Sequence, residues 1–394
     1  MLDFGVRLYG EGGRGSFARV TQGVMRALQV HGCFRGFVDA RANLDEFGGD
    51  PPGGRDAPVA IVCGGPDTIS LAHSQGSHDR IWFMLAANSE GFPQRLIDDL
   101  SDTNQFMTRP LIDGLLATSH WCAGVLRKSF PDKPVICMPH GVDPRVFYSE
   151  PEVREKLRAG YDAGGFGVLH VTSGASQRKG TRELLEAWAY LHQNEPAFAE
   201  GDKLLIVFVY PGAALLYERM AKDCGCVMQR GITRDQSGAA VMLIPGLGMD
   251  DSQVRASYSM VHVVCQPSRG EGFGLVPLEA LACGVPVVAT TCTGHSEHLV
   301  YRCYQNGVPR IGVCPVASGP NGPMDDYPGA MAPQVSRDDV RFALAHARDD
   351  WPRLENEARL ESAVVREELT WEKQGAAAIQ ELRADWETHR GATP

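Results

Sequence analysis

The chain has 394 residues, of which 43% are hydrophobic and 22% are charged, and its formal net charge is −10. This length is sufficient for two domains of ordinary size, and the negative charge argues against general binding to nucleic acid. The sequence holds no apolar run of about 18 residues and does not begin with a basic, apolar leader, so we expect a cytoplasmic protein. Its 11 cysteines include no C-x2-C pair, and several lie in apolar runs, which is typical of reduced, buried thiols.

A glycine-rich turn follows the first predicted strand. Gly10, Gly12 and Gly15 match the pattern G-x-G-x-x-G, a predicted helix follows them, and Asp39 ends a second apolar run. Taken alone, this arrangement is typical of a dinucleotide-binding unit, so one hypothesis is an NAD-dependent oxidoreductase. A tight turn with a purely structural role is another hypothesis, and a single match does not separate the two.

The predicted N-terminal helix carries Arg19 and Arg26, which are seven residues apart and therefore share one face. A charged helix face is most often simply exposed to solvent, and we favour this interpretation. The alternative is a peripheral contact surface for an anionic acceptor or for a membrane.

Apolar runs that alternate with helical segments predict an α/β chain with two Rossmann-like, doubly wound domains. Residues 59–63 and 115–118 continue the strands of the first half, and residues 167–173 begin a second series. A charged segment and then a glycine-rich one separate the two series. The two predicted domains and the segment of the final helix span residues 1–158, 159–368 and 369–394.

Two adjacent cations, Arg178 and Lys179, follow the first strand of the second series, in the turn before an amphipathic helix. Such side chains can neutralise the charge of a diphosphate where no metal ion does so. The sequence contains no D-x-D pattern, so we expect no metal at this site. A turn that is merely exposed to solvent is the alternative interpretation.

Residues 268–297 carry the strongest signal in the chain. An apolar, strand-like run leads into a turn with Gly272 and Gly274, and a helical segment follows. This order presents backbone N–H groups to an anion. Glu271 lies in the turn, and Glu279 is the one charged residue of an otherwise apolar helix. We expect Glu279 to be buried and therefore to need a partner. No cation lies at helical spacing from it, and a pair of ligand hydroxyls would be such a partner.

These features resemble the donor site of retaining glycosyltransferases of family 4, also called group 1, whose GT-B fold has two Rossmann-like domains facing a cleft. The resemblance rests on the E-x7-E pair Glu271 and Glu279 within EGFGLVPLEALACGVPVVAT, on the R-K-G triplet at 178–180, and on PHGVD at 139–143. It covers most of the chain, and it is closest from residue 135 to residue 300.

The resemblance implies roles for these residues. Arg178 and Lys179 would bind the diphosphate, Glu271 would hold the sugar, and Glu279 would accept hydrogen bonds from the ribose hydroxyls. Ser173 stands where the family often has a further arginine. The other donor-site candidates are Gly272, Phe273, Gly274 and Leu275.

In the N-terminal domain, the resemblance implies that Gly12 and Gly13 lean against the phosphates of the donor or against the acceptor. This is a third interpretation of the glycine-rich turn. Glu90 matches a glutamate that precedes a proline in the acceptor-facing domain, and His73 and His78 are candidates for contacting the donor sugar. A last helix, from about residue 371, is implied to cross back to the N-terminal domain.

The implied reaction transfers a sugar from a nucleotide diphosphate sugar, for example a UDP-sugar, with retention of anomeric configuration and without a metal or other cofactor. The sequence does not identify the acceptor, which leaves a lipid, a polysaccharide, a small molecule, a protein or a modified nucleobase. A nucleotide-sugar epimerase or isomerase of the same architecture is the nearest alternative. An inactive module that binds nucleotide sugars is another, and the oxidoreductase hypothesis explains only the first half of the chain.

Overall fold

The structure is a computed structural model of the chain, and it divides into two compact units. Unit 1 comprises Met1–Gly141 and Leu369–Pro394, and unit 2 comprises Val142–Glu368. The structure describes residues 4–11, 16–40, 57–64, 66–75, 78–90, 111–161, 165–172, 176–198, 202–208, 211–229, 238–246, 249–299, 312–324 and 330–390.

Unit 1 contains a six-stranded sheet with the order β2-β1-β3-β4-β5-β6, in which all neighbouring strands are parallel. Its strands are β1 (Val6–Gly10), β2 (Phe34–Asp39), β3 (Val59–Cys63), β4 (Arg80–Leu85), β5 (Gly114–Ala117) and β6 (Val135–Cys137). Its helices are α1 (Ser16–Val30), α3 (Pro66–Gln75), α5 (His120–Ser129) and α16 (Trp371–His389). This is the doubly wound arrangement expected from the sequence.

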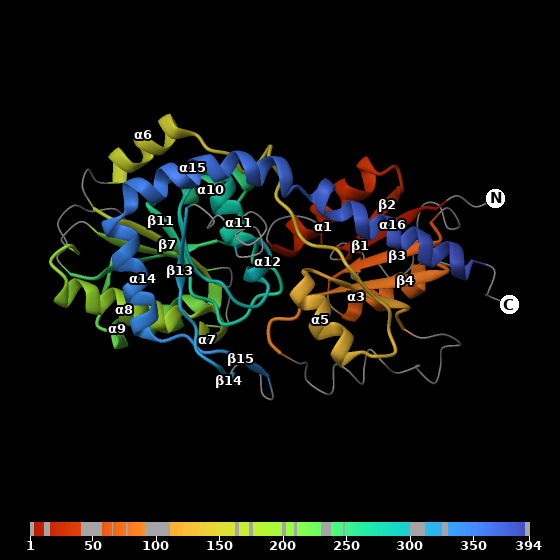
Figure 1. Ribbon diagram of the computed structural model, residues 1–394, viewed down its shortest axis with the longest axis horizontal. Helices are drawn as coiled ribbons and strands as arrows, with labels where there is room; N and C mark the ends of the chain where they lie inside the picture. Colours follow the sequence, from red (N-terminus) through yellow and green to blue (C-terminus); the bar gives the residue numbers. More distant parts are fainter. Residues whose placement is uncertain are drawn as a thin grey trace. The chain divides into compact units, whose positions relative to one another are not determined.

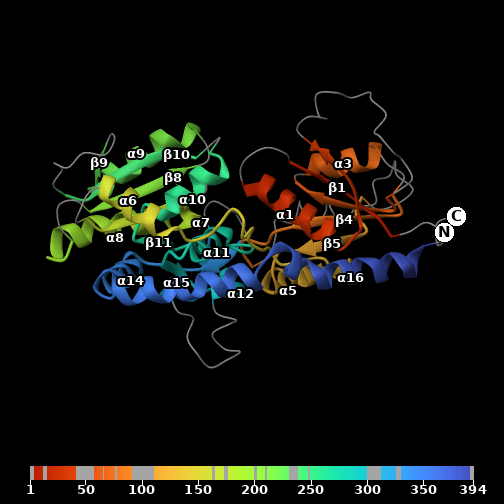
Figure 2. The same ribbon diagram turned by 90° about the horizontal axis from the view of Figure 1, so that it is seen from above.

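Helices cover both faces of this sheet (Figure 1). Successive side chains of a strand point to opposite faces, so a strand that is buried along its length needs helices on both sides. Tyr9 and Val62 share a buried cluster with side chains of α3 and α5. On the other face α1 packs against α16, and the same helices are seen from above in Figure 2. Gly375 permits this contact, since a Cβ atom there would lie 2.9 Å from the Cβ atom of Ala27.

Unit 2 contains a seven-stranded sheet with the order β13-β12-β11-β7-β8-β10-β9, again with parallel neighbours throughout. Its strands are β7 (Gly167–Thr172), β8 (Lys203–Phe208), β9 (Val227–Met228), β10 (Ala240–Pro245), β11 (Val263–Gln266), β12 (Val287–Thr290) and β13 (Val313–Val316). A separate antiparallel pair consists of β14 (Asn321–Pro323) and β15 (Met331–Pro333). The strand order reverses between β7 and β11, so this point is the topological switch of the sheet.

In unit 2, α8, α9 and α14 lie on one face of the sheet, and α10, α11 and α15 lie on the other (Figure 1). The helices and the short 3-10 turn η1 are α6 (Pro151–Tyr161), α7 (Ser176–Lys179), α8 (Thr181–Asn194), η1 (Pro211–Ala213), α9 (Ala214–Asp223), α10 (Asp251–Ser259), α11 (Leu275–Ala282), α12 (His295–Leu299), α14 (Arg337–Asp349) and α15 (Trp351–Glu368).

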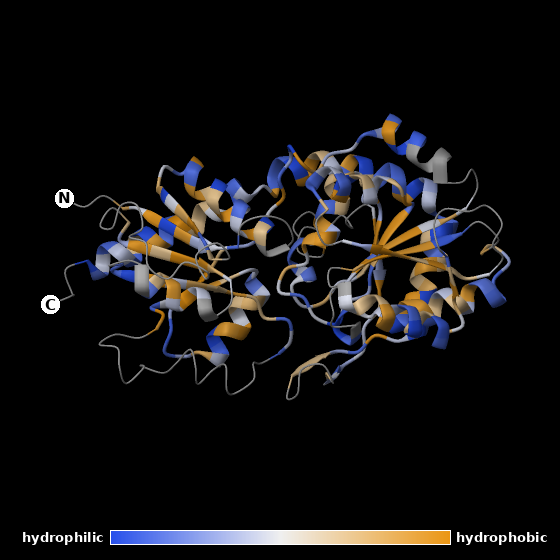
Figure 3. Cartoon of the chain, turned by 180° about the vertical axis from the view of Figure 1, so that it is seen from behind, coloured by the Kyte–Doolittle hydropathy of each residue, from blue (hydrophilic) through white to orange (hydrophobic). Residues whose placement is uncertain are grey.

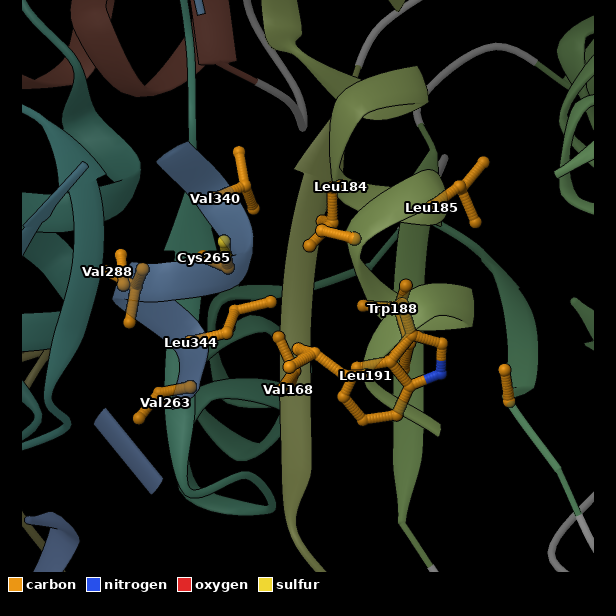
Figure 4. Close-up of a cluster of buried hydrophobic side chains, with 14 of the residues drawn as sticks. Val168, Leu184, Leu185, Trp188, Leu191, Val263, Cys265, Val288, Val340 and Leu344 are labelled. Carbon is orange, nitrogen blue, oxygen red and sulfur yellow. The ribbon is translucent and has the colours of Figure 1, made fainter. Parts of the chain in front are cut away.

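The core of unit 2 lies between the sheet and the pair α8 and α14. Trp188 and Leu191 of α8 and Leu344 of α14 pack on Val168 and Val263 of the central strands (Figure 4). Strands of both units are mostly hydrophobic (Figure 3), as expected when helices cover both faces of a parallel sheet. This rigid core fixes the ends of β7 and β11, from which the candidate site projects.

The boundary between the units falls after Gly141, which is earlier than the boundary at 158/159 expected from the sequence. The physical reason is that α6 packs against α10, and Arg154 of α6 donates a hydrogen bond to the carbonyl of Gly284 at 2.7 Å. The segment 369–394 belongs to unit 1, where α16 packs on α1. Within the described ranges, no helix combines the length and the apolar character needed to cross a membrane.

Candidate functional site

The cations Arg178 and Lys179 lie in α7, a single helical turn that follows β7 at the switch point of the sheet. Gly180 follows α7 with a positive φ of 66°. A Cβ atom at this glycine would collide with the carbonyl oxygen of Pro267, just after β11. The glycine of the R-K-G triplet therefore lets both cations approach the loop that carries Glu271.

Glu271 lies against both cations and is itself buried. Its Oε1 atom lies 2.6 Å from Nζ of Lys179 and 3.2 Å from Nη1 of Arg178. The same Nη1 atom donates a hydrogen bond to the carbonyl of Gly270 at 2.7 Å, so Arg178 holds the loop as well as the carboxylate. A buried charge requires partners of this kind, because an unpaired one is strongly destabilising.

Electrostatics keep the Glu271 carboxyl ionised. Burial by itself would raise the pKa of this group, but the charges of Lys179 and Arg178 outweigh burial and hold the pKa well below its ordinary value of 4.5. The ion pairs of Glu271 with Arg178 and Lys179 therefore stabilise the fold fully above pH 4.5. This contribution is lost as the pH falls toward the lowered pKa of Glu271 in the folded state.

A turn that follows β12 holds the backbone of Glu271. The hydroxyl of Thr293 accepts a hydrogen bond from the Glu271 amide at 3.0 Å, and the amide of Gly294 donates one to the Glu271 carbonyl at 2.8 Å. His295 begins α12, and its Nδ1 atom donates to the Thr290 carbonyl at 3.0 Å. Burial lowers the pKa of His295 to about 4, so the ring is neutral at pH 7 and its Nε2 atom is an acceptor.

Glu279 is buried in α11, with 2% of its surface exposed. The sequence shows no cation at helical spacing from Glu279, and the partner that the structure supplies is a hydroxyl: that of Tyr258 donates a hydrogen bond to the Oε2 atom at 2.6 Å. Tyr258 lies on α10, a different helix, so helical spacing around Glu279 could not reveal it. A carboxylate can accept several hydrogen bonds.

The segment between the two glutamates is closely packed against α12. A Cβ atom at Gly274, which precedes α11 with a φ of 90°, would collide with the ring of His295. Phe273 stacks on His298, with ring centroids 4.7 Å apart. The donor-site candidates in this loop and in the first turn of α11 are Gly272, Phe273, Gly274 and Leu275. The loop of Glu271 is therefore supported from α7, from α12 and from the turn before α12.

The acceptor-side candidates belong to unit 1. The ring nitrogens of His78 lie 2.8 Å from the Tyr9 hydroxyl and 2.8 Å from a backbone carbonyl, and the residue is buried. His73 lies 2.7 Å from another backbone carbonyl. Both histidines thus have contacts that explain them structurally, whereas Glu90 is exposed. Three further candidates, Gly12, Gly13 and Ser173, lie outside the described residues.

The arginine face of α1 is partly engaged within unit 1. Arg26 forms an ion pair with Glu372 of α16 at 3.1 Å. This contact supports a structural role for Arg26 and reduces the charge that α1 presents to an external partner.

Sequence reasoning missed three contributors to this site, namely Tyr258, Thr293 and Arg269. Arg269 forms a buried ion pair with Glu183 of α8, and its amide donates to the Arg178 carbonyl at 2.8 Å. It therefore ties α7 to the loop after β11. Its place two residues before Glu271 was visible in the sequence, but its partner on another helix was not. No cluster of His, Cys, Asp and Glu able to hold a metal occurs among the described residues.

Comparison with known sequences identifies a domain that contains this site. Residues 166–311 match the family model "Glycosyl transferases group 1". A GDP-mannose-dependent alpha-(1-6)-phosphatidylinositol monomannoside mannosyltransferase of Mycolicibacterium smegmatis is 33% identical over 167 residues, which are 41% of this chain and 39% of the relative. A D-inositol 3-phosphate glycosyltransferase of Stackebrandtia nassauensis is 32% identical over 169 residues, 43% of this chain and 36% of the relative. The chain thus spans less than two fifths of the length of these two relatives.

Solved structures resemble the whole chain at low sequence identity. The structure of HepE from Anabaena, in complex with UDP and glucose, has a TM-score of 0.64 and 14% identity, and covers 97% of this chain and 100% of that one. WaaG, a glycosyltransferase involved in lipopolysaccharide biosynthesis, has a TM-score of 0.57 and 15% identity, with 95% and 98% covered. These likenesses confirm the expected fold.

We expect Glu271→Gln to lower the free energy of unfolding by about 3 kcal/mol, because it leaves Arg178 and Lys179 buried beside a neutral group. Urea denaturation at pH 7, followed by circular dichroism, measures this change. The matched control is Glu218→Gln, which removes the same charge from the exposed Glu218–Lys222 pair and should change the free energy by less than about 0.5 kcal/mol. Equal effects of the two substitutions would contradict the role given to the buried cluster.

Proposed function

We propose that this chain, which has the GT-B fold and contains a group 1 glycosyltransferase domain at residues 166–311, is a retaining glycosyltransferase that uses a nucleotide diphosphate sugar. The observation that carries the proposal is the meeting of Arg178, Lys179 and Glu271 at the carboxyl ends of β7 and β11. Two cations and one carboxylate favour an anionic ligand. The switch point of a doubly wound sheet is also where such a ligand is expected.

In the proposed reaction, Arg178 and Lys179 stabilise the charge that develops on the diphosphate as its bond to the anomeric carbon breaks. The acceptor oxygen forms the new bond to that carbon from the same face, and its proton passes to the leaving diphosphate. Atoms and electrons balance without a protein nucleophile, an oxidant or a reductant. The protein supplies position and charge.

Glu271 changes partners in this scheme. In the structure its Oε1 atom is bound to Lys179 at 2.6 Å, and a bound diphosphate would offer the two cations additional oxygens. The carboxylate, which is an acceptor only, then receives hydrogen bonds from hydroxyls of the sugar. Glu271 thus keeps the cations paired before the donor binds and holds the sugar afterwards.

Glu279 is proposed to bind the ribose of the donor. The Tyr258 hydroxyl donates to its Oε2 atom, and we propose that hydroxyls of the ribose also donate to this carboxylate when the donor binds. Because Tyr258 comes from α10, it fixes the direction of the carboxylate from outside the donor loop. In this proposal Glu279 binds the nucleotide part of the donor, and Glu271 binds its sugar.

The names of the relatives suggest which ligands to test first. One relative is named GDP-mannose-dependent, and the solved structure of HepE holds UDP and glucose. We therefore propose that the donor is a purine or pyrimidine nucleoside diphosphate sugar, and GDP-mannose and UDP-glucose are the first two compounds to test. The relatives' names also mention phosphatidylinositol and inositol phosphate acceptors, so inositol-bearing acceptors lead the acceptor panel.

Substitution of the two glutamates should separate nucleotide binding from sugar binding. We expect Glu279→Ala to weaken binding of the bare nucleoside diphosphate and of its sugar ester equally, by about tenfold each, because both contain the ribose. Glu271→Gln should weaken binding of the sugar nucleotide only, because it removes the carboxylate that is proposed to bind the sugar while leaving both cations available to the diphosphate. Isothermal titration with UDP, UDP-glucose, GDP and GDP-mannose measures all four affinities.

The control for this titration is Glu218→Ala, on the exposed face of α9. Unchanged affinity in Glu279→Ala would remove that residue from the site. Equal losses for both ligands in Glu271→Gln would refute its assignment to the sugar.

Transfer should not depend on a divalent metal, because Arg178 and Lys179 supply the positive charge that the leaving diphosphate needs. We expect the rate of sugar transfer to be the same within about twofold before and after treatment with EDTA. Loss of activity with EDTA and its return with Mn²⁺ or Mg²⁺ would show that a metal supplies that charge.

A further inference from the structure

Thr293 has an unusual backbone conformation for its residue type. Its φ is 51°, and it is the one non-glycine residue with a positive φ among the residues that the structure describes. A β-branched residue is strained in this region, which glycine occupies readily. Glycine would therefore be the relaxed choice here, and the threonine side chain must contribute something that glycine lacks.

That contribution is a hydrogen bond to the donor loop. The Thr293 hydroxyl is buried and accepts from the amide of Glu271 at 3.0 Å. The amide of the next residue, Gly294, donates to the carbonyl of Glu271 at 2.8 Å. Two adjacent residues of one turn thus bind both backbone polar groups of Glu271.

The turn is held rigidly while it does so. A Cβ atom at Gly294 would collide with the carbonyl of Glu271 and with Gly272, so the two loops are in direct backbone contact. The amide and the hydroxyl of Ser296 both donate to the carbonyl of Thr293. The backbone of Glu271 is therefore fixed by this turn, whereas its carboxylate contacts the side chains of Arg178 and Lys179 of α7.

We propose that Thr293 is a positioning residue for the transferred sugar. By fixing the backbone of Glu271, it lets the carboxylate turn from Lys179 to the sugar hydroxyls without movement of the loop. This inference rests on the proposed role of Glu271 as the ligand of the sugar. It implies that the strained backbone at Thr293 costs stability but supports binding of the sugar by Glu271. A substitution that relieves the strain should therefore also weaken binding of the sugar.

The test compares Thr293→Gly, which removes the strain and the hydroxyl, with Thr293→Ser, which keeps the hydroxyl. The full-length protein is titrated with UDP, UDP-glucose, GDP and GDP-mannose, and its melting temperature is measured. For Thr293→Gly we expect the Kd of the sugar nucleotide to rise about tenfold, as for one hydrogen bond lost between Glu271 and the sugar when the backbone of Glu271 is no longer fixed. The Kd of the bare nucleoside diphosphate should change by less than about twofold. Relief of the backbone strain should offset the lost hydrogen bond, so that Tm stays close to that of the wild type. Thr293→Ser should bind both ligands within about twofold of the wild type.

A second arm makes Thr293→Gly in a Glu271→Ala background, where it should have no further effect on sugar nucleotide affinity. Wild-type affinity in Thr293→Gly would overturn the inference. So would an equal loss for both ligands together with a lower Tm, because the hydroxyl would then serve the fold alone. If the wild type bound no sugar nucleotide of the panel, the proposed function would fail, and this inference with it.

Discussion

The organisation of unit 2 depends on one buried carboxylate, that of Glu271, which neutralises two cations at the switch point of the sheet. Neither Arg178 nor Lys179 could be buried at the end of β7 without a counter-charge, because the desolvation of an unpaired charge is large. The counter-charge comes from the loop after β11, so the ion cluster joins the two central strands at their carboxyl ends. The same cluster leaves a net positive charge for an anionic ligand, so stability and the proposed binding have one origin.

Close approach of backbones makes this cluster possible. Gly180 brings α7 against the segment after β11, and Gly294 brings the turn after β12 against the loop of Glu271. A side chain at either position would separate the elements and lengthen the ion pairs. The strained Thr293 belongs to the same contact. Conformational strain is thus concentrated where the backbone of a proposed ligand residue is fixed.

Much of this arrangement could be predicted from the sequence, and the rest could not, for a definite physical reason. Alternation of apolar runs and helical segments predicted two doubly wound α/β units, and glycines beside Glu271 and Lys179 predicted loops at strand ends. Tyr258 and Arg269 were missed because their partners lie on other helices, at separations that no local period encodes. The boundary before α6 was misplaced for the same reason, since the packing of α6 on α10 is a tertiary contact. The strands β14 and β15 are too short to show a period of their own.

A crystal structure of the full chain with a nucleotide sugar that it binds in solution would show whether Glu271 exchanges the two cations for the sugar when the donor binds. We expect diphosphate oxygens within about 3 Å of Arg178 and Lys179, and a sugar hydroxyl at a similar distance from Glu271. A bound diphosphate that touches neither cation, with Glu271 still bound to Lys179, would contradict the roles proposed for these three residues.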